Sequence, residues 1–273
     1  MSKLASLGGN AVLVPLSLAL LLGTHMGVPS VLRLVTSEYD RAGSELEKHQ
    51  WQAYSVALLY TSLVAWVSGA ELAATGLSPS PAAVLQLTPI QRATTCTMVA
   101  YLLYDTLGIW RSKQLAAKDA TYKTQGSSAA GKLFHHALGF FSLLSCLITG
   151  HGGNVAMWVY FAELSTPFLS LRWLLLSAGS KGSALCKAVE VLFALTFTLC
   201  RVVSIPLLLR YLWRCRGAWT SAPASAPHFW YVLVTTCCFL GQNLFWFSHI
   251  VHMVRKAVGL AGGTKNKSEK KAD

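Results

Sequence analysis

The chain has 273 residues, of which 53% are hydrophobic and only 12% are charged. Because soluble domains carry roughly 25% charged residues, this composition excludes a soluble globular protein and indicates a chain that crosses a membrane several times. The formal net charge is +12. We expect no nucleic-acid partner, because the positive residues lie in predicted loops and in the C-terminal tail, where membrane topology and anionic lipid headgroups account for them.

Apolar stretches that are long enough to cross a bilayer, at about 20 residues each, recur along the chain. They lie near residues 10–34, 51–76, 90–110, 131–150, 153–178, 184–212 and 229–254. We therefore predict an all-α polytopic membrane protein with about seven transmembrane helices. The first stretch has a second interpretation as a signal peptide, because Lys3 precedes its apolar part. No Ala-x-Ala cleavage site follows, so a retained helix is favoured.

Lysine and arginine residues orient these segments. The connections after the first, third and fifth segments carry positive residues, those after the second and fourth carry none, and only the one after the sixth argues otherwise. The positive-inside rule therefore predicts a non-cytoplasmic N-terminus and a cytoplasmic C-terminus.

The C-terminal residues 258–273 are predicted to be a disordered, basic cytoplasmic tail. Lys270 and Lys271 stand where a dilysine signal would place them, and coat proteins recognise such signals when they return membrane proteins to the endoplasmic reticulum. The alternative is a plain solvated tail.

Ionisable side chains inside the predicted spans are functional-site candidates, because each is costly unless it is paired or faces a cavity. Their depth, at about 1.5 Å per residue, divides them into two layers. The layer nearer the cytoplasm contains Asp105, His135, His136, Arg172 and His249. In this layer the adjacent histidines are candidate catalytic residues, and Asp105 is a candidate to orient one of them. The alternatives are hydrogen-bonded interfacial histidines and an ion pair between Asp105 and a nearby cation.

The deeper layer, near the midplane, contains Glu163, Arg201 and Asn243. Glu163 and Arg172 lie about 180° apart around a straight helix, so we expect Glu163 to pair with Arg201 instead. Together with Arg172, these residues are candidates to line a lipid-contacting cavity. The alternatives are a structural ion pair, an interhelical hydrogen bond from Asn243 and an Arg172 side chain that extends to the headgroups.

Pro167 lies four residues after Glu163 and is predicted to kink this helix, because proline leaves the carbonyl one turn back without its donor. No metal site is predicted. The seven cysteines show neither CxxC nor zinc spacing, and we interpret them as small buried residues. His249 and His252 stand at i, i+3, but no further ligand at a suitable spacing supports a metal pair.

Several of these residues stand in motifs that resemble one known family. The motifs are Tyr104-Asp105, a basic loop, His135-His136, Ala162-Glu163-Leu164-Ser165-Thr166-Pro167-Phe168, Cys200-Arg201 with Pro206, and Asn243-Leu244-Phe245-Trp246-Phe247. Over roughly residues 45–257 the chain resembles the TLC-domain family, and its small TLC-domain-containing branch more than the ceramide synthases. We therefore divide the chain into an N-terminal helix and loop (1–44), a TLC domain (45–257) and the tail (258–273).

The resemblance implies six spans around a central lipid-accessible cavity. It also implies residence in the endoplasmic reticulum membrane and a role in lipid homeostasis, with a sphingolipid or phospholipid as partner and no cofactor. In ceramide synthases the paired histidines belong to the active site, which joins an acyl group from acyl-CoA to a sphingoid amine. His135 and His136 match that pair, so an N-acyltransferase with acyl-CoA as co-substrate is the alternative function. The further downstream acidic motif of those enzymes is absent, since residues 160–165 read Tyr-Phe-Ala-Glu-Leu-Ser.

Overall fold

The computed structural model describes residues 3–76, 84–118, 129–221 and 225–257, and the regular elements within these ranges are all helices. In chain order they are α1 (Lys3–Val35), α2 (Glu38–Arg41), α3 (Glu45–Thr75), α5 (Pro89–Ala116), α6 (Ala129–Thr149), α7 (Gly153–Phe161), the 3₁₀ helix η1 (Ala162–Ser165), α8 (Thr166–Ser177), α9 (Ala184–Phe197), the π-helix η2 (Thr198–Val203), α10 (Ser204–Thr220) and α11 (Ala226–Ala257).

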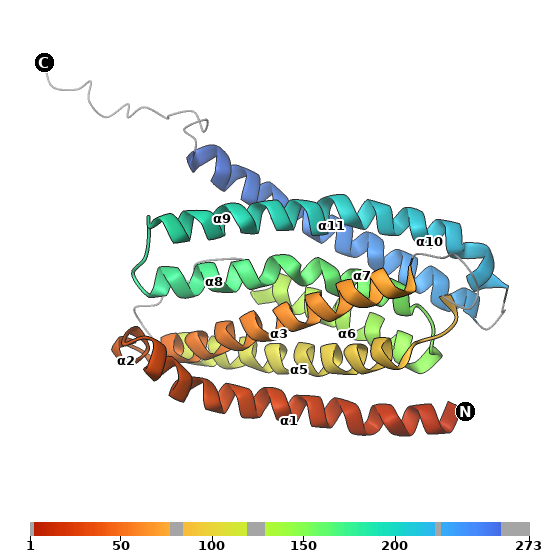
Figure 1. Ribbon diagram of the computed structural model, residues 1–273, viewed down its shortest axis with the longest axis horizontal. Coiled ribbons are helices and arrows are strands. Elements are labelled where there is room, and N and C mark those ends of the chain that lie inside the picture. The colour runs from red at the N-terminus through yellow and green to blue at the C-terminus, as the bar shows by residue number, and fades with distance from the viewer. Residues whose placement is uncertain (1–2, 77–83, 119–128, 222–224, 258–273) are drawn as a thin grey trace, which may run out of the picture.

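The long helical segments lie side by side along the long axis of the molecule (Figure 1). The chain reverses direction at the connections between them, whereas α7, η1 and α8 run on in one direction, as do α9, η2 and α10. The short α2 and the α8–α9 connection lie at the same end of the bundle (Figure 1). This is the end at which the predicted topology places the cytoplasm, although the side of the membrane itself remains a prediction.

Four helical segments within the described residues are long and apolar enough to cross a membrane: Val12–Val35, Glu45–Thr75, Ala129–Thr149 and Ala184–Thr220. The all-α polytopic fold is thereby confirmed. The predicted spans at 90–110, 153–178 and 229–254 are helical but lie outside this set. The middle one is divided into α7, η1 and α8, each of which is too short to cross a bilayer alone. The number of crossings therefore remains a prediction.

Local sequence explains where several helices begin. The Thr88 side chain accepts a hydrogen bond from the Gln91 amide, and the Gln91 side chain accepts one from the Thr88 amide. This capping box, followed by Pro89 at the first helical position, starts α5. Ser183 caps α9 by accepting from the Cys186 amide.

Two helices are irregular at their middles, and proline accompanies both irregularities. The 3₁₀ turn η1 ends two residues before Pro167, which confirms the predicted interruption near Glu163. In the second case the π-helix η2 precedes Pro206 of α10. Proline lacks the donor for the carbonyl one turn back, and a wide turn is one way in which a helix accommodates that loss.

Apolar packing forms two cores within the described residues. One joins α1, α3, α5, α6 and α7, and the other joins α7, α10 and α11. α1 belongs to the first core, since its Leu21 and Val28 are buried there. η1 contacts α3, α8, α9 and η2, so it lies where several helices meet. The predicted tail with Lys270 and Lys271 lies outside the described residues.

Candidate functional site

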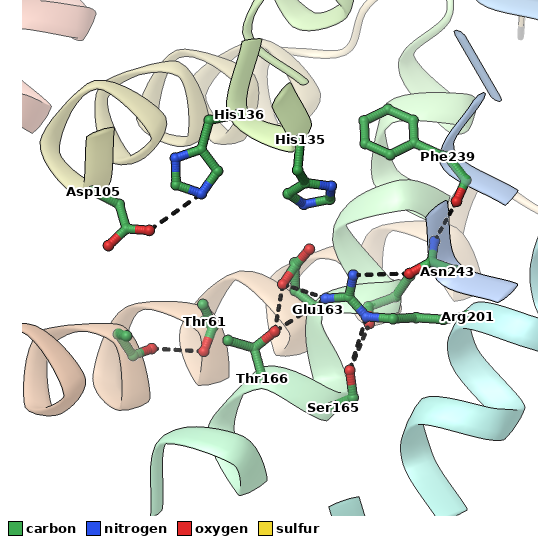
Figure 2. A network of polar contacts seen from close by, with 12 residues as sticks. Thr61, Asp105, His135, His136, Glu163, Ser165, Thr166, Arg201, Phe239 and Asn243 are labelled. Atoms are coloured by element: carbon green, nitrogen blue, oxygen red, sulfur yellow. Dashed lines mark hydrogen bonds and ion pairs between the residues drawn. The ribbon is translucent and has the colours of Figure 1, made fainter. Parts of the chain in front are cut away.

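A buried ion pair lies at the centre of the polar interior. Arg201 Nη2 donates to Glu163 Oε2 at 2.7 Å, and the two side chains are only 7% and 19% exposed (Figure 2). The predicted pairing of these two residues is confirmed. Because the carboxylate neutralises the guanidinium, the pair is tolerated at a depth where either charge alone would be strongly unfavourable.

The other donors of Arg201 also find acceptors. Nε donates to Ser165 Oγ at 2.9 Å, and Nη2 also donates to Thr166 Oγ1 at 3.1 Å. Nη1 lies 3.5 Å from Asn243 Oδ1, a long contact that links η2 to α11. The Thr166 hydroxyl in turn donates to Glu163 Oε2 at 2.6 Å. We call these five residues (Glu163, Ser165, Thr166, Arg201 and Asn243) the ion-pair cluster.

The two helix irregularities place the ion-pair cluster. Glu163 and Ser165 lie within the 3₁₀ turn η1, whereas Arg201 lies within the π-helix η2. η1 and η2 contact each other. Irregular turns inside long helices often mark functional sites, because they turn side chains away from the regular helical angles. Here both irregular turns contribute to the same cluster.

The adjacent histidines have different partners. His136 Nε2 lies 3.2 Å from Asp105 Oδ2, and its Nδ1 lies 3.2 Å from Thr106 Oγ1, so both ring nitrogens have polar neighbours (Figure 2). The predicted contact between Asp105 and one of the paired histidines is therefore present, and that histidine is His136.

His135 is held by α11 instead. Its Nδ1 lies 3.1 Å from Gln242 Oε1, and Gln242 Nε2 donates to the Gly131 carbonyl at 3.0 Å. Since the amide nitrogen of Gln242 is used by Gly131, its oxygen faces the histidine, and this assigns the ring proton to Nδ1. Nε2 of His135 then carries a lone pair. Phe239 and Trp246 pack against the same ring.

Two acceptor atoms of the site remain open. In the part of the chain that the structure describes, neither His135 Nε2 nor Glu163 Oε1 has a hydrogen-bond partner. In Figure 2 the His135 ring lies beside the Glu163–Arg201 pair, and the second oxygen of Glu163 points toward the histidines. This arrangement suits a bound group that donates hydrogen bonds, such as a hydroxyl or an amine.

Two residues of the predicted layers lie elsewhere. Arg172 Nε pairs with Glu190 Oε1 at 3.0 Å, between α8 and α9. Arg172 therefore does not join the ion-pair cluster, because its side chain bonds Glu190 of α9 instead. His249 is exposed, and its Nδ1 lies 3.0 Å from the carbonyl of Phe245 in its own helix.

Sequence reasoning did not assign roles to Thr106, Ser165, Thr166 or Gln242. Each stands within three residues of a residue that was singled out, namely Asp105, Glu163 or Asn243. For Ser165 and Thr166 the available signal was a short polar side chain near a buried charge, because such a charge needs several hydrogen bonds.

Within the described ranges, no group of three or more histidine, cysteine, aspartate or glutamate residues is arranged to hold a metal ion.

The fold and the site define a helical, multi-pass membrane protein with a polar interior built on a histidine pair and a buried Glu–Arg pair. Residues 50–252, more than half of the chain, match the profile of the family described as the TLC domain. The chain therefore belongs to the TLC-domain family, as its motifs predicted. It is also similar to the human protein CLN8, with 33% identity over 105 residues. That segment covers 37% of this chain and 35% of CLN8, so the chain matches about a third of that relative's length. The match is consistent with a branch of the family outside the ceramide synthases.

Proposed function

We propose that this protein takes part in lipid homeostasis by binding the headgroup of a sphingolipid or phospholipid in its polar interior. The observation that carries the proposal is the pair of open acceptors, His135 Nε2 and Glu163 Oε1, beside a neutralised ion pair. Amines and hydroxyls are the donors that membrane-lipid headgroups offer to such acceptors. The ion-pair cluster gives a polar group a partner inside an otherwise apolar bundle.

The proposed location is the endoplasmic reticulum membrane, with the C-terminus in the cytoplasm. Membership of the TLC-domain family supports it, as do the positions of Lys270 and Lys271 near the C-terminus. Coat proteins that read dilysine signals are the partners that this location implies.

A second candidate function is acyl transfer from acyl-CoA to a lipid amine. The contact between His136 and Asp105 favours it, together with the lone pair on His135 Nε2. In this reaction the amine nitrogen attacks the thioester carbon while His135 Nε2 takes the amine proton. The C–S bond breaks as the amide C–N bond forms, and the CoA thiolate leaves and receives the proton. Acyl-CoA is a co-substrate, and no cofactor is involved.

The test is lipidomics of the purified protein, comparing the wild type with the His135→Ala/His136→Ala double variant. The exposed residue His249 provides a matched control variant, His249→Ala, which removes a histidine outside the site. We expect the wild type and the control to retain the same lipid and the double variant to lose it. Equal lipid retention by all three proteins would contradict the proposed site. Incubation of the wild type with acyl-CoA and a sphingoid amine then separates the two functions, because only the enzyme forms the amide.

A further inference from the structure

A second polar feature lies between α8 and α9, apart from the ion-pair cluster. The two helices are joined by residues 178–183 and border an open pocket of about 540 Å³. Its lining includes Arg172 and Leu176 of α8, Lys181 of the connection, and Cys186, Lys187 and Glu190 of α9. We call it the α8–α9 pocket. None of its lining residues belongs to the ion-pair cluster.

The α8–α9 pocket carries a surplus of positive charge. Three cations and one carboxylate line it, and Glu190 is already paired with Arg172. Lys181 and Lys187 are exposed, and neither has an ion-pair partner among the residues that the structure describes. Two positive charges are therefore left for an anion.

The donor groups around the pocket also suit an anion with several oxygens. Arg172 bonds Glu190 through Nε, and within the described ranges its terminal nitrogens Nη1 and Nη2 have no acceptor. α9 begins at the pocket, with Ser183 as its cap, so the positive end of the helix dipole lies beside the lysines. Arginine, lysine and a helix N-terminus together form the set of donors that commonly binds phosphate.

We propose that the α8–α9 pocket binds a phosphate group carried by the headgroup of an anionic membrane lipid. Leu176 supplies an apolar wall to the pocket. The outward face of α9 also exposes Leu185, Val191 and Leu192, which is where lipid chains would contact the helix. The predicted topology places this end of the bundle at the cytoplasmic leaflet, where anionic lipids give a negative surface potential. A soluble phosphate compound offers the same chemistry and is the other source of the group.

The test uses the purified full-length protein in nanodiscs of phosphatidylcholine, with and without phosphatidic acid. Native mass spectrometry measures how much phosphatidic acid each variant retains. The Lys181→Gln/Lys187→Gln variant is compared with Lys113→Gln/Lys118→Gln, which removes the same charge from exposed lysines at the end of α5. A parallel arm titrates the detergent-solubilised protein with inorganic pyrophosphate. Thermal unfolding checks that both variants are folded.

We expect the Lys181/Lys187 variant to retain phosphatidic acid about ten- to thirtyfold less well than the wild type, because each basic residue at a membrane surface contributes to the binding of anionic lipid. The control variant should match the wild type. If only pyrophosphate binds, with the same dependence on these lysines, the pocket takes phosphate from a soluble compound. Equal losses in both variants, or no binding of either probe, would overturn the proposal. The outcome is independent of the proposed lipid site, because neither lysine touches His135 or Glu163.

Discussion

Arg201 and Glu163 meet at 2.7 Å from two helices that are each irregular at the point of contact. The bond joins the continuous helical segment formed by α7, η1 and α8 to the one formed by α9, η2 and α10. Ser165 and Thr166 extend the same junction. The polar interior of this TLC-domain protein is therefore also a structural junction, and its functional and structural roles have to be separated by paired substitutions.

The ion pair is expected to show strong coupling. Glu163→Gln or Arg201→Gln alone leaves a buried charge without its partner, and breaking such a pair typically costs about 3–5 kcal/mol. The double variant strands no charge, so it should recover much of the folded protein. The yield of monodisperse protein in detergent measures this for the two single variants and the double variant. Additive losses would show that the two residues do not couple.

Thr166 tests whether the bridging hydroxyl supports the pair. Thr166→Val keeps the shape but removes the atom that donates to Glu163 and accepts from Arg201. We expect the free energy of unfolding to fall by about 1–3 kcal/mol, the usual cost of unsatisfied buried partners. Thr166→Ser keeps the hydroxyl and should lose less. Thermal unfolding in a fixed detergent compares the two variants. An equal loss in both would mean that the hydroxyl contributes no more to stability than the methyl group that serine lacks, and it would contradict the bridging role of the hydroxyl.

Asp105 and His136 should behave as one unit. Their contact at 3.2 Å predicts that Asp105→Ala and His136→Ala together destabilise less than the sum of the two single changes, by about 1 kcal/mol. The comparison pair is Asp105→Ala with His249→Ala, which should be additive because His249 lies outside the site. A coupling of zero for Asp105 and His136 would mean that the contact contributes nothing to the fold.

The predicted topology can be tested by cysteine labelling. Lys118→Cys and Ser80→Cys are introduced separately into a variant in which alanine replaces the exposed Cys237 and Cys238. In sealed microsomes, whose outer face is cytoplasmic, a membrane-impermeant maleimide should label residue 118 and should reach residue 80 only after permeabilisation. The reverse labelling pattern would show that the topology is inverted. The predicted orientation rests on the positive-inside rule alone.

The helical architecture could be predicted from the sequence, because each apolar stretch is long and carries few charges. The Glu163–Arg201 pair could be predicted as well. A carboxylate and a guanidinium at matched depth on successive antiparallel segments have few other partners in an apolar bundle. Pro167 likewise indicated the interruption at η1.

Contacts that depend on the rotation of helices about their own axes could not be predicted in this way. Depth along a helix places Asp105 near both histidines, but the angle around α6 decides that His136 makes the contact and that His135 faces Gln242. The same limit explains Arg172, whose partner Glu190 is set by the packing of α9 on α8. The π-helix η2 adds to the difficulty, because it departs from the period of 3.6 residues on which such reasoning depends.

That π-helix also bears on how the chain could have evolved. A π turn holds one residue more than the α-helical turn that it replaces, so deleting one residue from Thr198–Val203 would return this stretch to the α-helical period, apart from the bond that Pro206 cannot donate. The same deletion within α9 or α10 would rotate everything beyond it by about 100°. The insertion of a single residue into a regular helix is therefore enough to create the wide turn that carries Arg201. Within the segment formed by α9, η2 and α10, sequence alignments of TLC-domain proteins should place their gaps at η2.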